Sequence, residues 1–214
     1  MAILSLLTTE LTATPQSVTD IIISDLASPR GAIDFGDPSY GYAQEFTVTS
    51  GTWNIFQAQI NLGDGAGLPG SPLLQVRNYL GAGLAPGTEV LGSFTMNPND
   101  IPTGFNFANI VATANNDFIL GPGTYWLCFG NDLPTGGFWV AFADDGSLVQ
   151  DGISGIVNMD TVAQSGDGGQ TFGTPSLGGY DLIFGLQGQP VPEASTLSLL
   201  GIGFVFLGWN FVRR

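Results

Sequence analysis

The sequence predicts an all-β fold, an antiparallel two-sheet β-sandwich of jelly-roll type, followed by a single C-terminal transmembrane helix. Residues 40–185 consist of short apolar runs separated by Gly, Pro, Asn and Asp at a spacing of about 8 to 12 residues, which is typical of an all-β domain. No stretch in this part has the periodicity of an amphipathic helix. An uncharged, apolar run at 197–212 then precedes the final residues Arg213 and Arg214.

The chain divides into four segments. Residues 1–39 are expected to hold a first strand or the remnant of a truncated signal peptide, because the initial MAILSLL is apolar but short and lacks a basic residue. A β-sandwich domain over 40–187, a Pro-containing linker over 188–196 and a transmembrane helix with a basic tail over 197–214 complete the chain. We predict strands at 43–48, 53–62, 73–80, 89–96, 106–112, 123–129, 138–142 and 180–186. The Gly-rich segment 165–179 (SGDGGQTFGTPSLGG) is predicted to be a mobile loop or linker.

The 53–62 strand (WNIFQAQINL) indicates a sheet that is buried on one side. Ile55 and Gln57 alternate with Phe56 and Ala58, so the pattern places Phe56 on the core side and Ile55 on the solvent side. The strand at 123–129 (GTYWLCF) is apolar on both faces and should therefore be central. Its Cys128 is predicted to be a small buried hydrophobic residue rather than a reactive thiol.

Composition excludes several classes of function. The chain has 4 basic and 18 acidic residues, for a net charge of −14, and all the acids lie in residues 1–193 with only Arg30 and Arg77 beside them. Nucleic-acid binding is excluded, because such binding replaces phosphate counterions with cations. The absence of His and the single Cys exclude Ser-His-Asp and Cys-His catalysis, a zinc site of His and Cys ligands, and an internal disulfide. Catalysis would depend on carboxylates alone, and we expect no enzyme.

The C-terminal tail has the properties of a membrane anchor. As a helix, the run at 197–212 would cover about 24 Å, which spans a bilayer when flanking residues lie in the interface. A buried core helix is the alternative, although this run has no polar face and ends in two arginines. As a membrane stop, Arg213 and Arg214 belong in the cytoplasm, and the acidic domain lies on the exported side. Two prolines keep the preceding stretch extended and accessible to a protease.

A short motif, VPEAST, stands directly before this run. Its residues are Val191, Pro192, Glu193, Ala194, Ser195 and Thr196. Together with the apolar run and the terminal arginines, the motif resembles the PEP-CTERM sorting signal of bacterial surface proteins, with Ala194 where that family often has a second proline. The resemblance implies that an exosortase, a membrane transpeptidase-like enzyme, recognises this motif, cuts there and passes the protein to the cell surface or the exopolysaccharide matrix. An ordinary solvated carboxylate is the alternative interpretation of Glu193.

A second resemblance concerns the body of the chain. The segments at 43–48 (AQEFTV), 85–92 (APGTEVLG) and 120–129 (LGPGTYWLCF), with the strands at Trp53 and Trp139, resemble the choice-of-anchor R domain. This resemblance implies a surface-anchored β-sandwich module that occurs with various anchoring tails. It implies no activity, because no catalytic residues are assigned to that family.

Aspartates beside Gly or Asn recur in the predicted loops. They occur at 64–65, 99–100, 115–117, 131–132, 144–146 and 167–168. Extracytoplasmic β-sandwiches often hold Ca²⁺ between such loops, and Asp144 and Asp145 are the first candidate ligands. Simple turn formation is the alternative. A glycosidase would need a pair of carboxylates across a cleft, but with 18 acidic residues the proximity of two of them decides nothing.

Aromatic residues provide a candidate sugar site. Trp139, Tyr180 and Tyr40 could stack on sugar rings, because aromatic faces bind such rings and jelly rolls include lectins. Packing in the core explains the tryptophans equally well.

These patterns together predict an exported structural or adhesive protein, associated with the cell surface or the extracellular matrix. An exosortase would process its precursor, which is anchored in the inner membrane through 197–212. The alternative is a carbohydrate-binding module for exopolysaccharide on the same anchor, with Ca²⁺ as a candidate structural ion. No other cofactor is expected.

Overall fold

The computed structural model describes residues 19–23, 31–34, 41–64, 72–102, 106–131, 138–144, 156–177 and 180–191. Among them, the one helix is the short 3₁₀ helix η1 (Pro98–Asp100), and no helix of these residues is long and apolar enough to cross a membrane. The strands are β1 (Thr19–Ile23), β2 (Gly31–Asp34), β3 (Gly41–Val48), β4 (Trp53–Asp64), β5 (Pro72–Asn78), β6 (Val90–Met96), β7 (Ala108–Leu120), β8 (Gly123–Asn131), β9 (Phe138–Asp144), β10 (Ile156–Ser165), β11 (Ser176–Leu177), β12 (Tyr180–Leu182) and β13 (Phe184–Pro190).

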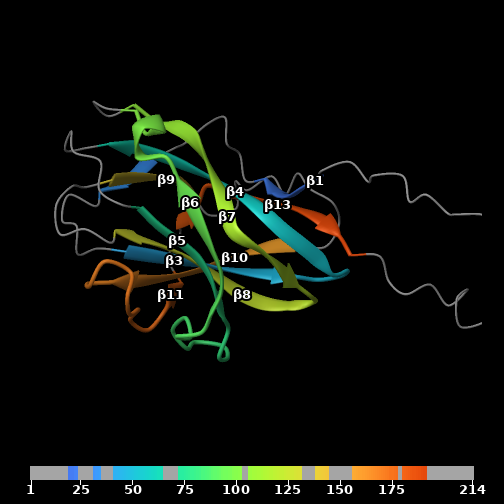
Figure 1. The fold of residues 1–214 in the computed structure, drawn as a ribbon. Helices are drawn as coiled ribbons and strands as arrows, with labels where there is room; N and C mark the ends of the chain where they lie inside the picture. The colour runs from blue at the N-terminus through green and yellow to red at the C-terminus, as the bar shows by residue number, and fades with distance from the viewer. Residues whose placement is uncertain are drawn as a thin grey trace, which may run out of the picture.

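The described strands form one antiparallel sheet. Its order is β1-β13-β4-β7-β6-β5-β8-β3-β10-β11, and β9 pairs outside this path with β2, β4 and β12. Figure 1 shows β4, β7 and β13 on one side of the molecule and β3, β8 and β10 on the other, joined through β5 and β6. The prediction of an all-β, antiparallel fold is confirmed. The predicted division into two sheets is not shown, because the pairing of β5 with both β6 and β8 continues the hydrogen bonding from one half to the other.

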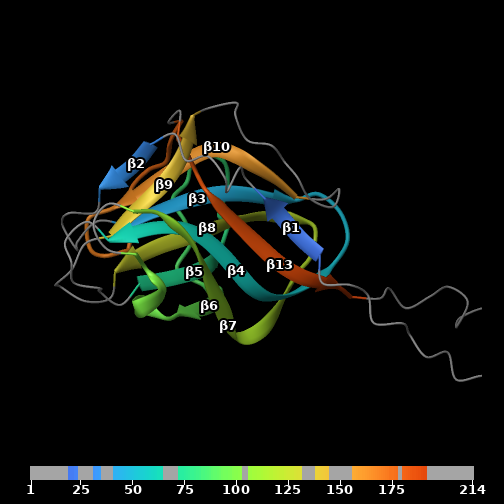
Figure 2. The ribbon, with the colours of Figure 1, turned by 90° about the horizontal axis from the view of Figure 1, so that it is seen from above.

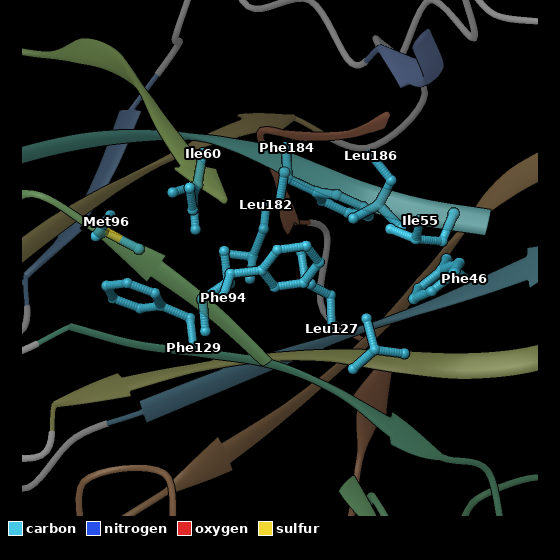
Figure 3. Packing of buried hydrophobic residues seen from close by; sticks show 14 of the residues in the cluster. Phe46, Ile55, Ile60, Phe94, Met96, Leu127, Phe129, Leu182, Phe184 and Leu186 are labelled. Atoms are coloured by element: carbon cyan, nitrogen blue, oxygen red, sulfur yellow. The ribbon is translucent and has the colours of Figure 1, made fainter. Parts of the chain in front are cut away.

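The sheet curls around a single large core. Its two ends approach each other, since β10 contacts both β12 and β1 (Figure 2). Side chains from both halves meet inside, among them Phe46, Phe94 and Phe184, and Figure 3 shows them facing one another in the enclosed space. The Phe46 and Phe184 rings meet edge to face with centroids 6.1 Å apart, an arrangement that aromatic pairs favour.

A buried glutamine links β3 with β10 and β12. Gln44 on β3 is fully buried, and its Oε1 accepts a hydrogen bond of 3.1 Å from the backbone N–H of Leu182. Its Nε2 donates to the carbonyl of Thr161, where the pairing of β10 with β3 shifts register. Because unpaired backbone groups are costly in a protein interior, this side chain stabilises the place where regular pairing is interrupted.

The alternation predicted for 53–62 is wrong in its first half. A register shift between Ile55 and Gln57 places Trp53 and Ile55 on the core face, whereas Phe56 is only half-buried. From Ala58 to Ile60 the predicted alternation is correct, but Asn61, which the pattern placed on the solvent side, is 3% exposed. A β-bulge adds one residue to a strand and so exchanges the faces of the residues on its two sides.

A bulge also explains why β7 is longer than predicted. We expected a strand at 106–112 and a turn at 115–117, but β7 runs to Leu120 and carries its extra residues opposite Phe56. Asn115 Nδ2 donates to Ser93 Oγ at 2.8 Å, and Thr95 Oγ1 donates to Asn115 Oδ1. Neighbouring strands therefore stabilise polar residues that the sequence pattern assigned to a turn.

The predicted strand at 180–186 is two strands. β12 pairs with β9, whereas β13 pairs with β4 and β1, and the change of partner falls at Ile183, whose carbonyl accepts from Asn61 N–H. The other predicted strands agree with β3, β5, β6, β8 and β9 to within two residues at each end. The sequence patterns missed β10 and β11, and they gave no bounds for β1 and β2 within 1–39.

Candidate functional site

The junction between the body and the tail is part of the sheet. β13 lies between β4 and β1, and its last residue, Pro190, stands opposite Trp53. The backbone N–H of Val191 then donates to the Thr52 carbonyl at 2.8 Å. Trp53 is buried, and its indole N–H donates to the Ser50 carbonyl, which fixes this corner. The first residue of the predicted motif therefore directly follows a strand that is hydrogen-bonded on both sides.

The rest of the predicted sorting and membrane residues lie outside the described residues. These are Pro192, Glu193, Ala194, Ser195, Thr196, the run at 197–212, and Arg213 and Arg214. Asp145 and Tyr40 also lie outside them.

The remaining sugar and calcium candidates lie on two paired strands. Tyr180, at the start of β12, stands opposite Asp144, at the end of β9. Trp139 lies near the other end of β9, opposite Asp34 of β2 and Gly63 of β4. The fold thus brings Tyr180 and Asp144 together and places Trp139 five positions away along the strand.

Within the described part of the chain, no three His, Cys, Asp or Glu residues come together in a group that could hold a metal ion. Two of the aspartates in the predicted loops accept hydrogen bonds from asparagine side chains. Asp100 Oδ1 accepts from Asn97 Nδ2 at 3.1 Å, and Asp117 Oδ2 accepts from Asn54 Nδ2 at 3.0 Å. The contact of Asp100 favours the turn interpretation at 99–100, whereas 115–117 belongs to β7 and is not a turn.

Asp167 organises a tight loop after β10. Its carboxylate accepts from the Thr171 hydroxyl and backbone N–H and from the Ser165 hydroxyl, at 2.6 to 2.8 Å. These hydrogen bonds, those from Thr171 first, lower the pKa of Asp167 to about 2. Gly168 and Gly169 follow with positive φ angles of 73° and 90°, which side-chain-bearing residues rarely adopt. The segment at 165–177 is therefore a structured loop and strand, and the prediction of a linker is wrong there.

This loop covers the outer face of β5, β8 and β3. Arg77 on β5 is buried, and its guanidinium donates to the carbonyls of Gly169 (2.8 Å) and Gln170 (3.0 Å) and to Gln75 Oε1. The Phe172 ring lies 5.3 Å from the guanidinium carbon, within the range of a cation–π contact. Gly130 and Gly169 approach so closely that a Cβ on Gly130 would overlap the loop backbone.

Two further polar side chains, Glu45 and Trp126, are buried under this cover. Glu45, Trp126 and Arg77 are register neighbours across β3, β8 and β5. The Trp126 indole N–H is buried without a hydrogen bond, and Glu45 is 4% exposed. Burial raises the pKa of the Glu45 carboxyl, because desolvation disfavours its charged form.

Cys128 lies beside Trp126 in the same cluster with Ala43 and Ala163. It is a free, buried thiol, and burial raises its pKa to about 12, although Arg77 partly opposes the shift. A thiol with such a pKa is scarcely ionised at neutral pH and is a poor nucleophile. The prediction of Cys128 as a buried hydrophobic residue is confirmed, as is the burial of both faces of its strand.

We interpret this covered cluster as structural, although the sequence patterns did not identify it. Arg77 binds the loop carbonyls and Gln75, and Trp126 and Cys128 are buried. The sequence carried one usable signal: Arg77 is the lone cation between residues 31 and 212, and it lies on a strand that is otherwise suited to a core.

One family model matches the chain. It is described as the PEP-CTERM protein-sorting motif and covers residues 190–214. No curated protein and no solved structure matches the sequence. The match begins at Pro190, the last residue of β13, so the motif starts where the sheet ends. Such a motif implies exosortase-dependent sorting of an exported protein, whose precursor is anchored in the membrane.

Proposed function

We propose that the protein is a sorted component of the bacterial cell surface or extracellular matrix with a structural or adhesive role. An exosortase cuts the precursor within the VPEAST motif, and the β body is released from its membrane anchor at 197–212. The observation that carries the proposal is the position of the motif match, 190–214, which begins at Pro190, the last residue of β13.

The junction supports a cut beyond Val191. The backbone of β13 is paired with β4 through Pro190, and Val191 N–H is bonded to Thr52. A protease needs an extended backbone that is free of such pairing, and the residues up to Val191 do not provide one. Cleavage at Glu193 would therefore leave the sheet and its core intact.

A non-catalytic role is part of the proposal. The buried carboxylate of Glu45 and the buried thiol of Cys128 are inside the covered cluster, where a substrate would first have to displace the loop at 165–175. The two-sheet division and the choice-of-anchor R relationship that the sequence suggested remain part of the same proposal, supported by the all-β body and its C-terminal anchor signal.

The test is the intact mass of the product. The gene with its native upstream region is expressed in a host with an exosortase and in a strain lacking that enzyme. We expect the product to lose the chain beyond about Glu193 in the first host alone. A tail that stays in both hosts would show that 197–212 is a permanent anchor, and the proposal would be wrong.

A matched pair of variants localises the recognition. Glu193→Gln removes the motif carboxylate, and we expect uncut precursor to accumulate. Glu89→Gln makes the same change at an exposed residue of the body, and its product should be cut like the wild type. Equal processing of both variants would exclude Glu193 from recognition.

A further inference from the structure

The curled sheet has an outer face that the loop at 165–175 does not cover. It is formed by β13, β4, β7 and β6, and we call it the amide face. One register row crosses all four strands, because Gln187 pairs with Gln57, Gln57 with Thr113, and Thr113 with Thr95. With strands about 4.8 Å apart, this row presents amide and hydroxyl groups over roughly 14 Å. Gln59, which pairs with Val111, continues the face along the strands.

Hydrogen bonds between strands hold part of this face in place. Asn115 is bonded to both Ser93 and Thr95 of β6. Asn54 Nδ2 donates to Asp117 Oδ2 across β4 and β7 at 3.0 Å. Side chains that are already fixed lose little conformational entropy when they bind a ligand.

The amide face is almost uncharged. Among the side chains that the structure describes on these four strands, Asp117 is the one charged group. One of its carboxylate oxygens already accepts a hydrogen bond from Asn54 Nδ2. An ordinary solvent-facing surface has about a quarter to a third of its residues charged. Val111 and Ile119 are 44% and 62% exposed on the same strand, so the face also offers apolar contact.

We propose that the amide face binds a neutral polysaccharide. Amide and hydroxyl groups donate and accept hydrogen bonds as sugar hydroxyls do, and the face has no cation that would hold a polyanion. A second copy of the chain is a poorer occupant, because each copy has a net charge of −14 and would repel the other. The inference deepens the proposed adhesive role and rests on it, since it names the polymer class and the surface that contacts it.

Affinity electrophoresis of the full chain in non-ionic detergent tests the proposal. The probes are native gels that contain hydroxyethylcellulose, a neutral polymer, or alginate, a polyanion. We expect the neutral polymer to retard the protein and alginate to leave its mobility unchanged. Retardation should also be insensitive to salt, because no charge pairs form. Retardation by alginate alone, or by neither polymer, would overturn the proposal.

Variants assign the binding to the amide face. The double change Gln57→Ala and Thr113→Ala removes the centre of the row and should weaken binding about tenfold, the effect of losing one or two hydrogen bonds. The control is Gln170→Ala, on the opposite half, whose backbone carbonyl rather than its side chain accepts from Arg77. If the double variant unfolds, Thr113→Val removes one hydroxyl with little change of shape and should still weaken binding about threefold.

Further outcomes separate the possible failures. Wild-type binding by the row variants would overturn the assignment of the face. Self-association that the row variants abolish, without retardation by either polymer, would make the face an interface between copies. The intact mass of the secreted product is measured in parallel. It reports on sorting alone, so loss of sugar binding with normal processing would refute this inference and leave the sorting proposal standing.

Discussion

The two outer faces of the sheet differ in what lies over them. On β5, β8 and β3, the loop at 165–175 covers Trp126, Arg77 and Cys128, and the strands are buried on both sides. On β4 and β7 the outward residues are half-buried or exposed, as Val111 and Ile119 show. The comparison shows that a strand of this chain is apolar on both faces where a loop covers its outer face. Apolar residues on both faces of a strand therefore indicate such a covering loop, and they do not indicate whether the strand is central in the sheet.

The largest expected effect comes from Arg77. Arg77→Ala removes the guanidinium from the carbonyls of Gly169 and Gln170 and from the Phe172 ring, which leaves buried acceptors without donors. We expect the free energy of unfolding to fall by about 3 kcal/mol in urea titrations. Arg77→Lys keeps the charge but loses the forked geometry of the guanidinium, so its free energy of unfolding should lie between those of Arg77→Ala and the wild type. An unchanged midpoint for Arg77→Ala would mean that the loop does not hold the face.

The next effect tests the close approach of the loop. Gly130→Ala would place a Cβ 2.9 Å from Gly169 Cα and in overlap with the Gly168 carbonyl, so the loop must move. We expect a loss of about 2 kcal/mol in thermal or urea unfolding. Gly166→Ala lies in the same loop, with no atom within 4 Å of the added Cβ, and should have little effect. Equal losses for both variants would count against a tight cover.

A smaller effect of opposite sign is expected at Glu45. Its pKa is raised in the folded state, so its contribution to stability is complete below the unfolded pKa and is lost as the pH rises through the folded value. Glu45→Gln removes the desolvated charge and should make the protein more stable at pH 7, by about 1 kcal/mol, with the gain vanishing below the ordinary pKa of 4.5.

The pH dependence is the decisive readout for Glu45. The urea unfolding midpoints of the wild type and of Glu45→Gln are measured from about pH 3 to about pH 8, a range that includes the titration of carboxyl groups. Glu89→Gln, at an exposed position, is the control and should not show the same gain. A gain that is independent of pH would mean that burial of the Glu45 charge is not its cause.

The smallest effect belongs to the uncovered face. Val111→Thr exchanges two β-branched residues at a position that is 44% exposed, and we expect a change within about 0.5 kcal/mol in urea unfolding. A loss several times larger would show that Val111 is covered in solution, and the contrast between the two faces would then be lost.

The sequence predicted strands well where the apolar pattern of the strand matches its burial in the structure. The strand from Gly123 was predicted with both faces buried, because its apolar residues are consecutive and the structure covers them on both sides. The prediction failed at Ile55 and Phe56, because a bulge exchanges the faces of the residues on its two sides and the residue types do not reveal it. It failed again at Asn115, whose partners Ser93 and Thr95 belong to another strand.

The two sites also differ in how far the sequence could predict them. The sorting motif is local, so the residues at 190–214 carry the whole signal, and the family match agrees with it. The covered cluster is not local, because Arg77 stabilises a loop more than 90 positions away in the chain. The Gly-rich composition at 165–179 therefore predicted a linker, because the residue that holds this loop in place, Arg77, is distant in the sequence.

The position of β13 determines how the body would respond to a pulling force on its tail. The chain leaves the sheet from a strand with neighbours on both sides, β4 and β1, and not from a free edge. Because antiparallel hydrogen bonds run perpendicular to the strands, tension along β13 loads two ladders in shear, and many bonds must break together. An edge strand peeled from its end would instead lose its bonds one by one. The position of β13 is therefore suited to a body that stays folded while force acts on the chain that follows Val191.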